Sequence, residues 1–406
     1  MDSLKETYWL TRIVFLRCLA FMYAVAFMVA YNQNESLIGE NGLTPATLYL
    51  DQRPKDASVY DLMMSHPTIF WMIEPTSANL NNCAAAGLFI SILVTCSGSA
   101  NIPIMFLLWS LYFSIVTVGQ RWYQFGWESQ LLETGFLAMF MVPVLSLRRF
   151  PKLTTTPWVT IWGYRWLLFR IMIGAGMIKI RGDQCWRDLT CMNYHYQTQP
   201  VPNFFSIYFH YTPEWVHKLE TLGNHIVELA LPVLLLSPWR VPRILGGIAQ
   251  IGFQVVLVLS GNLAFLNWLT ALPAVACFDD ASLVGFFSKG DIKRAQETVV
   301  NISKRKLRDG LGWKGLIVYS RRVVAGVLAV WLAYLSYPVV NNILSPNQAM
   351  NVSFGAFRIV NSYGAFGSIT KVRYEVILQG TNESFLHPGT VWKDFEFTCK
   401  PGDINR

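Results

Sequence analysis

The sequence predicts an all-α polytopic membrane protein with about nine spanning helices and a partial lumenal β-rich C-terminal region. Two observations lead to this fold class. Hydrophobic residues make up 53% of the 406 residues and charged residues only 14%, whereas a soluble domain carries roughly 25% charged residues. The uncharged stretches are also long enough, because about 20 helical residues cross a hydrocarbon layer of roughly 30 Å.

The predicted spans follow one another with polar or basic segments between them. The first span follows Lys5 and Arg12 and is too long for the core of a signal peptide, so we interpret it as a retained span. Pro103 and Pro273 are expected to kink or end the third and eighth spans. The predicted spans are 12–31, 81–99, 102–119, 127–147, 158–179, 223–238, 243–260, 262–278 and 322–344.

Basic residues predict the orientation of these spans, because cytosolic loops carry an excess of Lys and Arg. With a cytosolic N-terminus, the alternation places 148–152, 240–243 and the basic loop 279–322 in the cytosol. The loops 32–80 and 180–222 and the C-terminal tail then lie in the lumen. Topology thus explains the net charge of +8, and we expect the lipid bilayer, not nucleic acid, as a partner.

We divide the chain into a transmembrane domain, 1–345, and the start of a lumenal β-rich domain, 346–406. In the second part, 371–378 and 392–397 alternate polar and apolar residues around a turn signal at 380–382, which is typical of strands. Two or three strands alone are marginal in water, so this region is either incomplete or leans on the membrane portion.

Glycosylation sequons give a second test of the orientation. They predict lumenal N-glycans on Asn382, Asn351 and Asn34, whereas the sequon at Asn301 falls in the predicted cytosolic loop and is expected to be unused.

Charged residues inside the predicted spans are candidates for buried polar pairs, because an unpaired charge in hydrocarbon is costly. The set comprises Glu133, Arg165, Arg170 and Glu228, with Arg17 in the first span. Arg170 falls near mid-membrane, within reach of either glutamate. We favour an ion pair that holds helices together; the alternatives are a functional polar cavity and a path for charge translocation.

The loop 180–222 combines two cysteines with many aromatic residues. Cys185 and Cys191 have five residues between them, which favours a short structural disulfide in an oxidising lumen. Free thiols, a redox pair and a zinc site that includes His195 are the alternatives.

The aromatic residues of this loop favour a position at the membrane interface. The alternative is a platform that holds the exposed apolar surface of a client protein. For that alternative, the candidate contact residues are Tyr194, Tyr196, Phe204 and Phe205.

Common enzyme motifs are absent from the sequence. There is no G-x-S-x-G, no H-E-x-x-H and no phosphate-binding loop. Their absence makes an enzyme less expected but does not exclude one, because catalytic residues could converge from different spans. The runner-up hypothesis is a membrane-embedded enzyme that uses Glu and Arg residues from different spans.

Long segments of the chain resemble the lipase maturation factor family. They are rich in Trp, Cys and Gly and extend over nearly the whole chain from about residue 10 onward. Within the family, the two cysteines of the CWRDLTC segment favour the first member over the second. The segments that carry the resemblance are 122–135, 169–183, 185–191, 194–200, 260–270 and 363–370.

The resemblance implies an endoplasmic-reticulum membrane protein that acts as a maturation factor or chaperone and not as an enzyme. We therefore expect no catalytic residue, no metal site and no cofactor. Its expected clients are secreted dimeric lipases such as lipoprotein lipase and hepatic lipase, engaged by a lumenal C-terminal region. The family's C-terminal domain continues beyond the point where this chain stops, which implies that Cys399 has lost its disulfide partner. The nine-span arrangement also resembles the transmembrane part of vitamin-K-dependent carboxylase, a likeness of fold only.

Overall fold

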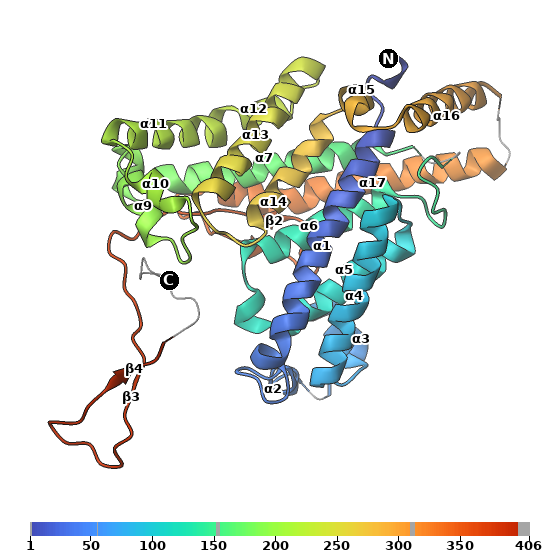
Figure 1. Cartoon of the computed structure of the whole chain (residues 1–406). Coiled ribbons are helices and arrows are strands. Elements are labelled where there is room, and N and C mark those ends of the chain that lie inside the picture. Colours follow the sequence, from blue (N-terminus) through green and yellow to red (C-terminus); the bar gives the residue numbers. More distant parts are fainter. Residues whose placement is uncertain (1, 55, 152–154, 309–312, 397–406) are drawn as a thin grey trace.

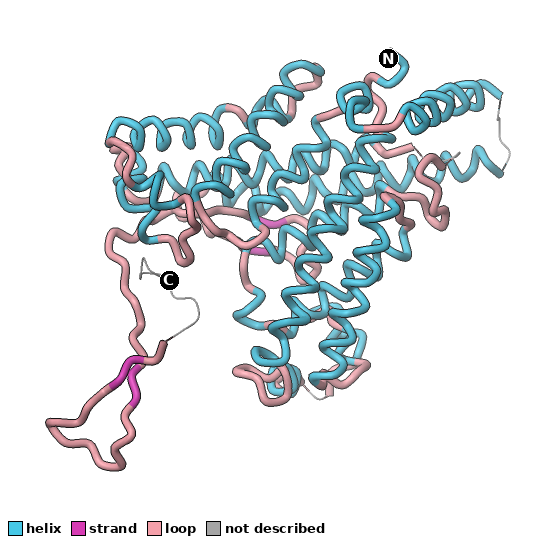
Figure 2. Tube along the Cα trace, in the orientation of Figure 1, coloured by secondary structure: helices cyan, strands magenta, loops and turns pink. Residues whose placement is uncertain are grey.

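The computed structural model describes residues 2–54, 56–151, 155–308 and 313–396. Helices form most of this part of the chain, and the strands are few and short (Figures 1 and 2). The α-helices are α1 (Trp9–Ile38), α2 (Ala46–Asp51), α3 (Val59–Ser65), α4 (Ser77–Ser97), α5 (Ile102–Val118), α6 (Gly126–Met141), α7 (Trp158–Arg181), α8 (Gln184–Arg187), α9 (Met192–Thr198), α10 (Ser206–His210), α11 (Glu214–His225), α12 (Pro232–Leu235), α13 (Arg240–Ser260), α14 (Leu266–Ala271), α15 (Asp280–Leu283), α16 (Lys289–Arg308) and α17 (Trp313–Leu344).

The prediction of a mostly helical protein with several apolar helices is confirmed, but the count of nine spans is not. Among the described residues, four helices have the length and composition of a span: α1, α4, α13 and the Tyr319–Leu344 part of α17. A fifth is possible if Leu266–Cys277 and Asp280–Phe286, which are bent by 120°, form one broken span. A helix nevertheless lies in each of the nine predicted ranges.

The remaining predicted spans fall short for identifiable reasons. α5 and α6 have only 17 and 16 residues, whereas about 20 are needed. α7 has 24 residues but carries several charged side chains. The predicted span 223–238 is divided between the end of α11, a π-helical segment at Ile226–Ala230 and the short α12.

The core is built around α1, whose inward face includes Phe15, Tyr23 and Phe27, all fully buried. α1 lies alongside α4 (Figure 1). Gly87 of α4 lies directly against the Phe27 ring, and a larger side chain there would collide with it. Small residues let helices approach closely where lipid provides no hydrophobic driving force between them.

The α4–α5 hairpin shows how the local sequence sets the helix ends. α4 ends at Gly98, which has a left-handed φ of 63° that glycine adopts without steric cost. α5 begins after Asn101, whose side-chain oxygen accepts a hydrogen bond from the amide of Ile104 at 3.1 Å.

One end of the molecule collects the segments that are predicted to be cytosolic. Arg243 pairs with Glu6 across 2.9 Å, and Arg12 donates a hydrogen bond to the carbonyl of Arg149 at 2.7 Å. The N-terminal segment, residues 148–151 and the start of α13 therefore meet at one place, near α15 and α16 (Figure 1).

The loops that are predicted on the other side also form a chain of contacts. Trp122 Nε1 donates to Thr44 Oγ1 at 2.8 Å, and the side chain of Asn351 lies against Gly126. The tail after α17 in turn contacts the 180–222 segment. The contacts thus divide the connecting segments into the same two groups as the charge pattern.

The tail holds two small antiparallel sheets. β1 (Val352–Ser353) pairs with β2 (Asn361–Ser362), and β3 (Gln379–Gly380) pairs with β4 (Lys393–Asp394). The predicted strand 371–378 lies outside both sheets, and Tyr374 and Val376 are 87% and 84% exposed. An alternating pattern forms a stable ladder only when another layer covers its apolar face. Cys399 lies outside the described residues.

A buried carboxylate far along the chain caps the first helix. Asp280 is fully buried, and its oxygens accept hydrogen bonds from the amides of Trp9, Leu10 and Thr11 at 2.8, 2.7 and 3.1 Å. The first amides of a helix have no partner inside it, so this side chain satisfies donors that would otherwise be buried alone. It ties α1 to the segment after α14.

We expect Asp280→Ala to destabilise the protein by about 2 kcal/mol, because three buried amides lose their acceptor. The measurement is the thermal midpoint of the detergent-solubilised protein, followed by tryptophan fluorescence. Asp56→Ala, at an exposed position, is the control and should leave the midpoint unchanged. Equal midpoints for the two variants would contradict the capping role.

Candidate functional site

A buried ion pair joins α6 to α7. Glu133 and Arg170 are each only 1% exposed, and an Arg170 nitrogen contacts a Glu133 carboxylate oxygen. The sequence allowed either Glu133 or Glu228 as the partner of Arg170, and in the structure the partner is Glu133. Charges at this depth are stable only when paired and hydrogen-bonded.

The tail completes this ion pair. The second carboxylate oxygen of Glu133 accepts hydrogen bonds from the Asn361 amide, the Asn361 side chain and the Tyr363 hydroxyl at 3.1, 3.0 and 2.8 Å. Arg170 also donates to the Asn361 carbonyl at 2.6 Å. Strand β2 is therefore held between α6 and α7. Both carboxylate oxygens of Glu133 and two nitrogens of Arg170 have partners in the pair or the tail, whereas Arg170 Nε has no hydrogen-bond partner among the described residues.

A second buried pair links α7 to the π-helical segment after α11. Lys179 Nζ lies 2.6 Å from a carboxylate oxygen of Glu228 and 3.1 Å from Asn224 Oδ1. Trp186 covers the ammonium group, with the ring centroid 4.9 Å from Nζ. The partner of Glu228 is thus Lys179 rather than an arginine inside a predicted span.

The prediction that Arg165 joins an acidic partner is wrong. Its guanidinium group donates to the Ala276 carbonyl at 3.0 Å and to the Tyr8 hydroxyl at 2.9 Å. The Trp162 ring lies 5.4 Å from its Cζ atom. A carbonyl, a hydroxyl and an aromatic face take the place of a carboxylate. The neighbouring Glu6 accepts a hydrogen bond from the same Tyr8 hydroxyl at 3.4 Å and pairs with Arg243 instead.

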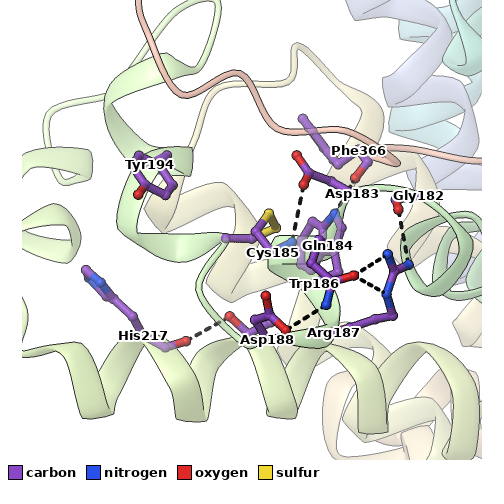
Figure 3. Close-up of a disulfide and its surroundings, with 12 residues drawn as sticks. Gly182, Asp183, Gln184, Cys185, Trp186, Arg187, Asp188, Tyr194, His217 and Phe366 are labelled. Atoms are coloured by element: carbon purple, nitrogen blue, oxygen red, sulfur yellow. Dashed lines mark hydrogen bonds between the residues drawn. A yellow bond between two sulfur atoms is a disulfide. The ribbon is translucent and has the colours of Figure 1, made fainter.

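Beyond the end of α7, Cys185 and Cys191 form a disulfide with Cα atoms 4.8 Å apart (Figure 3). Arg187 folds back to donate hydrogen bonds to the carbonyls of Ile180 and Gly182, and so caps the last turn of α7. The disulfide therefore closes a tight turn that is attached to a long helix. Together with Trp186, Met192, Tyr196 and Ile369 it forms a small separate core.

The tail packs over this disulfide segment as well. The indole nitrogen of Trp186 donates to the Phe366 carbonyl at 2.8 Å, as Figure 3 shows. The Asp183 amide donates to the Gly367 carbonyl at 2.8 Å. A side chain at Gly182 would collide with that carbonyl, so the close approach of the tail requires glycine there. The same tail thus contacts both the buried ion pair and the disulfide.

The four candidate client-contact residues differ in exposure. Phe204 and Phe205 are 76% and 48% exposed. Tyr194 is half-buried, and Lys371 lies above its ring. Tyr196 is only 5% exposed and donates a hydrogen bond to Glu220 at 2.9 Å, so its ring is part of the small core and cannot form a contact surface.

Exposed apolar and aromatic side chains gather on α10, α11 and the segment before them. We call this set the aromatic surface. It comprises Phe204, Phe205, Tyr208, Tyr211, Trp215, Leu219 and Leu222.

A cavity of about 730 Å³ lies beneath the disulfide segment, between it and the helices. Lys179, Trp186, His195, Tyr196 and Glu228 line it together with residues of α6, α13, α14 and the tail. Burial lowers the pKa of His195 to about 4, so this side chain is neutral at physiological pH.

The predicted glycosylation sites also differ in access. Asn382 and Asn351 are exposed. Asn34 is fully buried within α1, and its side chain accepts a hydrogen bond from the Tyr123 hydroxyl at 2.6 Å. An asparagine in this position cannot accept a glycan in the folded protein, which corrects the expectation for Asn34.

Comparison with known families identifies the chain. The family model of the lipase maturation factor transmembrane domain matches residues 10–285. The model of the lipase maturation factor C-terminal domain matches residues 359–406. The chain belongs to the lipase maturation factor family.

Curated members of the lipase maturation factor family align with almost the entire chain. Lipase maturation factor 1 of Bos taurus is 52% identical over 406 residues, which covers 98% of this chain and 72% of the relative. Lipase maturation factor 1 of Homo sapiens is 50% identical, covering 98% and 71%. Lipase maturation factor 2 of Rattus norvegicus is 27% identical, covering 97% and 69%. No solved structure matches the chain.

Sequence reasoning missed several residues at this family member's buried centres. Lys179 lies at the boundary of a predicted span, where a lysine is usually an interfacial anchor. Nothing in the sequence around Asn361 predicts a buried contact. Tyr363 stands out only because it belongs to a segment that resembles the family. Their partners lie in distant helices, so no local pattern reports them.

Because removal of one partner leaves a buried charge, we expect Glu133→Gln or Arg170→Met alone to destabilise the protein by about 3–5 kcal/mol. The double variant should lose less than the sum of the two single losses. The readouts are the thermal midpoint and the yield of monodisperse protein. Glu214→Gln breaks the exposed pair with Lys218 and should leave both readouts unchanged. Strictly additive losses would show that the two side chains are not coupled.

Proposed function

We propose that this protein is an endoplasmic-reticulum membrane factor that assists the folding and assembly of secreted dimeric lipases, such as lipoprotein lipase and hepatic lipase. The observation that carries the proposal is the alignment of 98% of the chain with proteins named lipase maturation factor 1, at 50–52% identity. The apolar helices place it in a membrane, and the contacts that divide its loops into two groups support a cytosolic N-terminus and a lumenal tail.

The aromatic surface supplies a physical basis for client binding. Along α11, Trp215, Leu219 and Leu222 are 65%, 56% and 43% exposed, and their spacing of four and three residues aligns them as one stripe on the helix. A folding lipase monomer exposes apolar surface that its partner subunit later covers. Reversible contact with this stripe would protect the lipase monomer from aggregation. The assembled lipase dimer would be released because its partner subunit then covers the apolar surface that bound the stripe.

The structure beneath this surface supports such a role. The disulfide segment holds the surface on the end of α7, and the hydrogen bond from Tyr196 to Glu220 joins α9 to α11. Contact groups on a fixed base lose less conformational entropy on binding than groups on a mobile loop. The alternative role of the same stripe is to lie at the membrane interface, where amphipathic helices also settle.

We propose that the buried charges have a structural rather than a catalytic role. Both oxygens of Glu133 and the two terminal nitrogens of Arg170 already contact partners within the protein. A general acid or base must reach a substrate proton within hydrogen-bond distance. In this arrangement the pair would have to release the tail before it could do so.

The proposed function predicts that the chain restores lipase secretion to cells that lack their endogenous factor. Active lipoprotein lipase in the medium is the readout, with the amount of lipase protein in the cell as the reference. We expect secreted activity to rise while a co-expressed monomeric secreted protein is unaffected. Unchanged lipase activity, with this chain present at normal abundance in the endoplasmic reticulum, would refute the proposal.

The role of the aromatic surface predicts a more specific effect. The triple change Phe204→Ala, Tyr211→Ala and Trp215→Ala should lower lipase co-precipitation at least tenfold, because the loss of even one such anchor costs about 1–2 kcal/mol of binding free energy. The matched control is Leu43→Ala, Tyr60→Ala and Met72→Ala, at residues that are 72%, 70% and 74% exposed in the 32–80 loop. Equal loss in both triple variants would show that the aromatic surface is not the contact.

A further inference from the structure

The cavity beneath the disulfide segment has the size and the lining of a ligand site. Its volume of about 730 Å³ falls within the range of roughly 300–1,000 Å³ that small-molecule sites occupy. Ile171, Met172, Ala175 and Phe253 give it an apolar wall. The tail closes part of it, through Tyr363 and Phe366 among others.

The cavity opens beside a helix with the composition of a membrane span. α13 buries Gln250 and Gln254, whereas Leu245, Ile248 and Val256 on its outer face are half-exposed. A helix on the surface of a soluble protein has the opposite arrangement, with polar side chains outside and apolar ones inside. Inward polar and outward aliphatic side chains are expected when the outer face of a helix contacts lipid. Val256 is exposed and also lines the cavity, so the opening lies where lipid is the solvent.

Polar groups without partners lie inside the cavity. Gln199 is 3% exposed, and its Oε1 atom accepts no hydrogen bond from the described residues. Gln254 is 4% exposed, and its side chain makes no hydrogen bond to any described residue. Buried polar groups normally have a partner. Gln199 also donates to the Ser260 carbonyl at the end of α13, which places the two amides at the same end of this helix.

The described lining residues of the cavity include no unpaired lysine or arginine. Lys179 is the only lysine or arginine among its described lining residues, and Glu228 pairs with it across 2.6 Å. Glu220 accepts a hydrogen bond from Tyr196, and burial raises the pKa of this carboxyl group. An anionic head group would therefore meet no free cation here, whereas hydroxyl and carbonyl groups fit the unpaired amides.

We propose that this cavity binds one uncharged lipid of the acylglycerol class, taken directly from the membrane. Its hydroxyl or ester groups hydrogen-bond to the side chains of Gln199 and Gln254, and its acyl chain lies along α7 and α13. The proposal does not rest on the proposed lipase function, because it follows from the cavity, its charge balance and its opening alone.

Two glycines provide a matched pair of variants. A side chain added at Gly223 or at Gly252 meets no atom within 4 Å. Gly223 lines the cavity, whereas Gly252 on α13 is exposed and does not. Gly223→Leu therefore fills part of the cavity without displacing the backbone, and Gly252→Leu adds the same side chain outside it.

The test uses the full chain in phosphatidylcholine nanodiscs with a diacylglycerol that carries a photoreactive diazirine in one acyl chain. We expect crosslinks to cavity-lining peptides of α7 and α13, identified by mass spectrometry. Gly223→Leu and Gln254→Leu should each lower this labelling about fivefold, the effect of losing roughly one hydrogen bond or an equivalent contact. Gly252→Leu should label like the unmodified protein, and the thermal midpoint of each variant reports its folding.

Phosphatidic acid with the same acyl chains and diazirine serves as the anionic comparison, and we expect it to label these peptides weakly. Equal labelling by this probe would overturn the assignment to an uncharged lipid. Labelling confined to the outer face of α13, unchanged by Gly223→Leu, would show ordinary bilayer contact instead. Loss of diacylglycerol labelling on addition of a catalytically inactive lipase, which cannot hydrolyse the probe, would assign the cavity to a client segment and would also overturn the proposal.

Discussion

The ion pair between Glu133 and Arg170 is the constraint on which much of this structure depends. A charged pair inside a helical bundle is stable only when its remaining hydrogen-bonding groups are also satisfied. Here the tail supplies them through Asn361 and Tyr363. The need to satisfy two buried charges thus brings a segment from beyond the last helix into the centre of the bundle.

That placement of the tail has consequences at a distance. Once residues 361–363 are held between α6 and α7, the following residues run along α7 to its end, where Phe366 accepts a hydrogen bond from Trp186. The disulfide between Cys185 and Cys191 lies at the same place. One continuous stretch of chain therefore covers the ion pair, closes part of the cavity and stabilises the base of the aromatic surface.

Polar side chains in this molecule point toward the protein interior, as expected where lipid surrounds the helices. The glutamines of α13 point inward and its aliphatic residues point outward. Arg165 donates hydrogen bonds to a carbonyl and a hydroxyl of the protein. Such inward polar groups favour unique helix packing, because each donor must meet its own acceptor. They also leave interior positions such as Gln254 available to a polar ligand.

The sequence by itself determined the helices and the family. Long apolar stretches are a local property, so the nine predicted ranges each contain a helix, and the cysteine- and tryptophan-rich segments indicated the relatives. Local composition could not decide how those helices break, and 223–238 contains a π-helical segment. The segment 371–378 forms no strand because no layer of described residues covers its apolar side chains Tyr374 and Val376.

Only the tertiary structure decided which polar groups meet. Glu133 finds Asn361 across 228 residues, Asp280 caps a helix about 270 residues earlier in the chain, and Glu228 pairs with a lysine at the edge of a predicted span. Burial likewise removed Tyr196 from the contact surface and Asn34 from the glycan sites. Pairing and burial depend on how helices pack together, and packing is set by complementary surfaces that no single stretch of sequence contains.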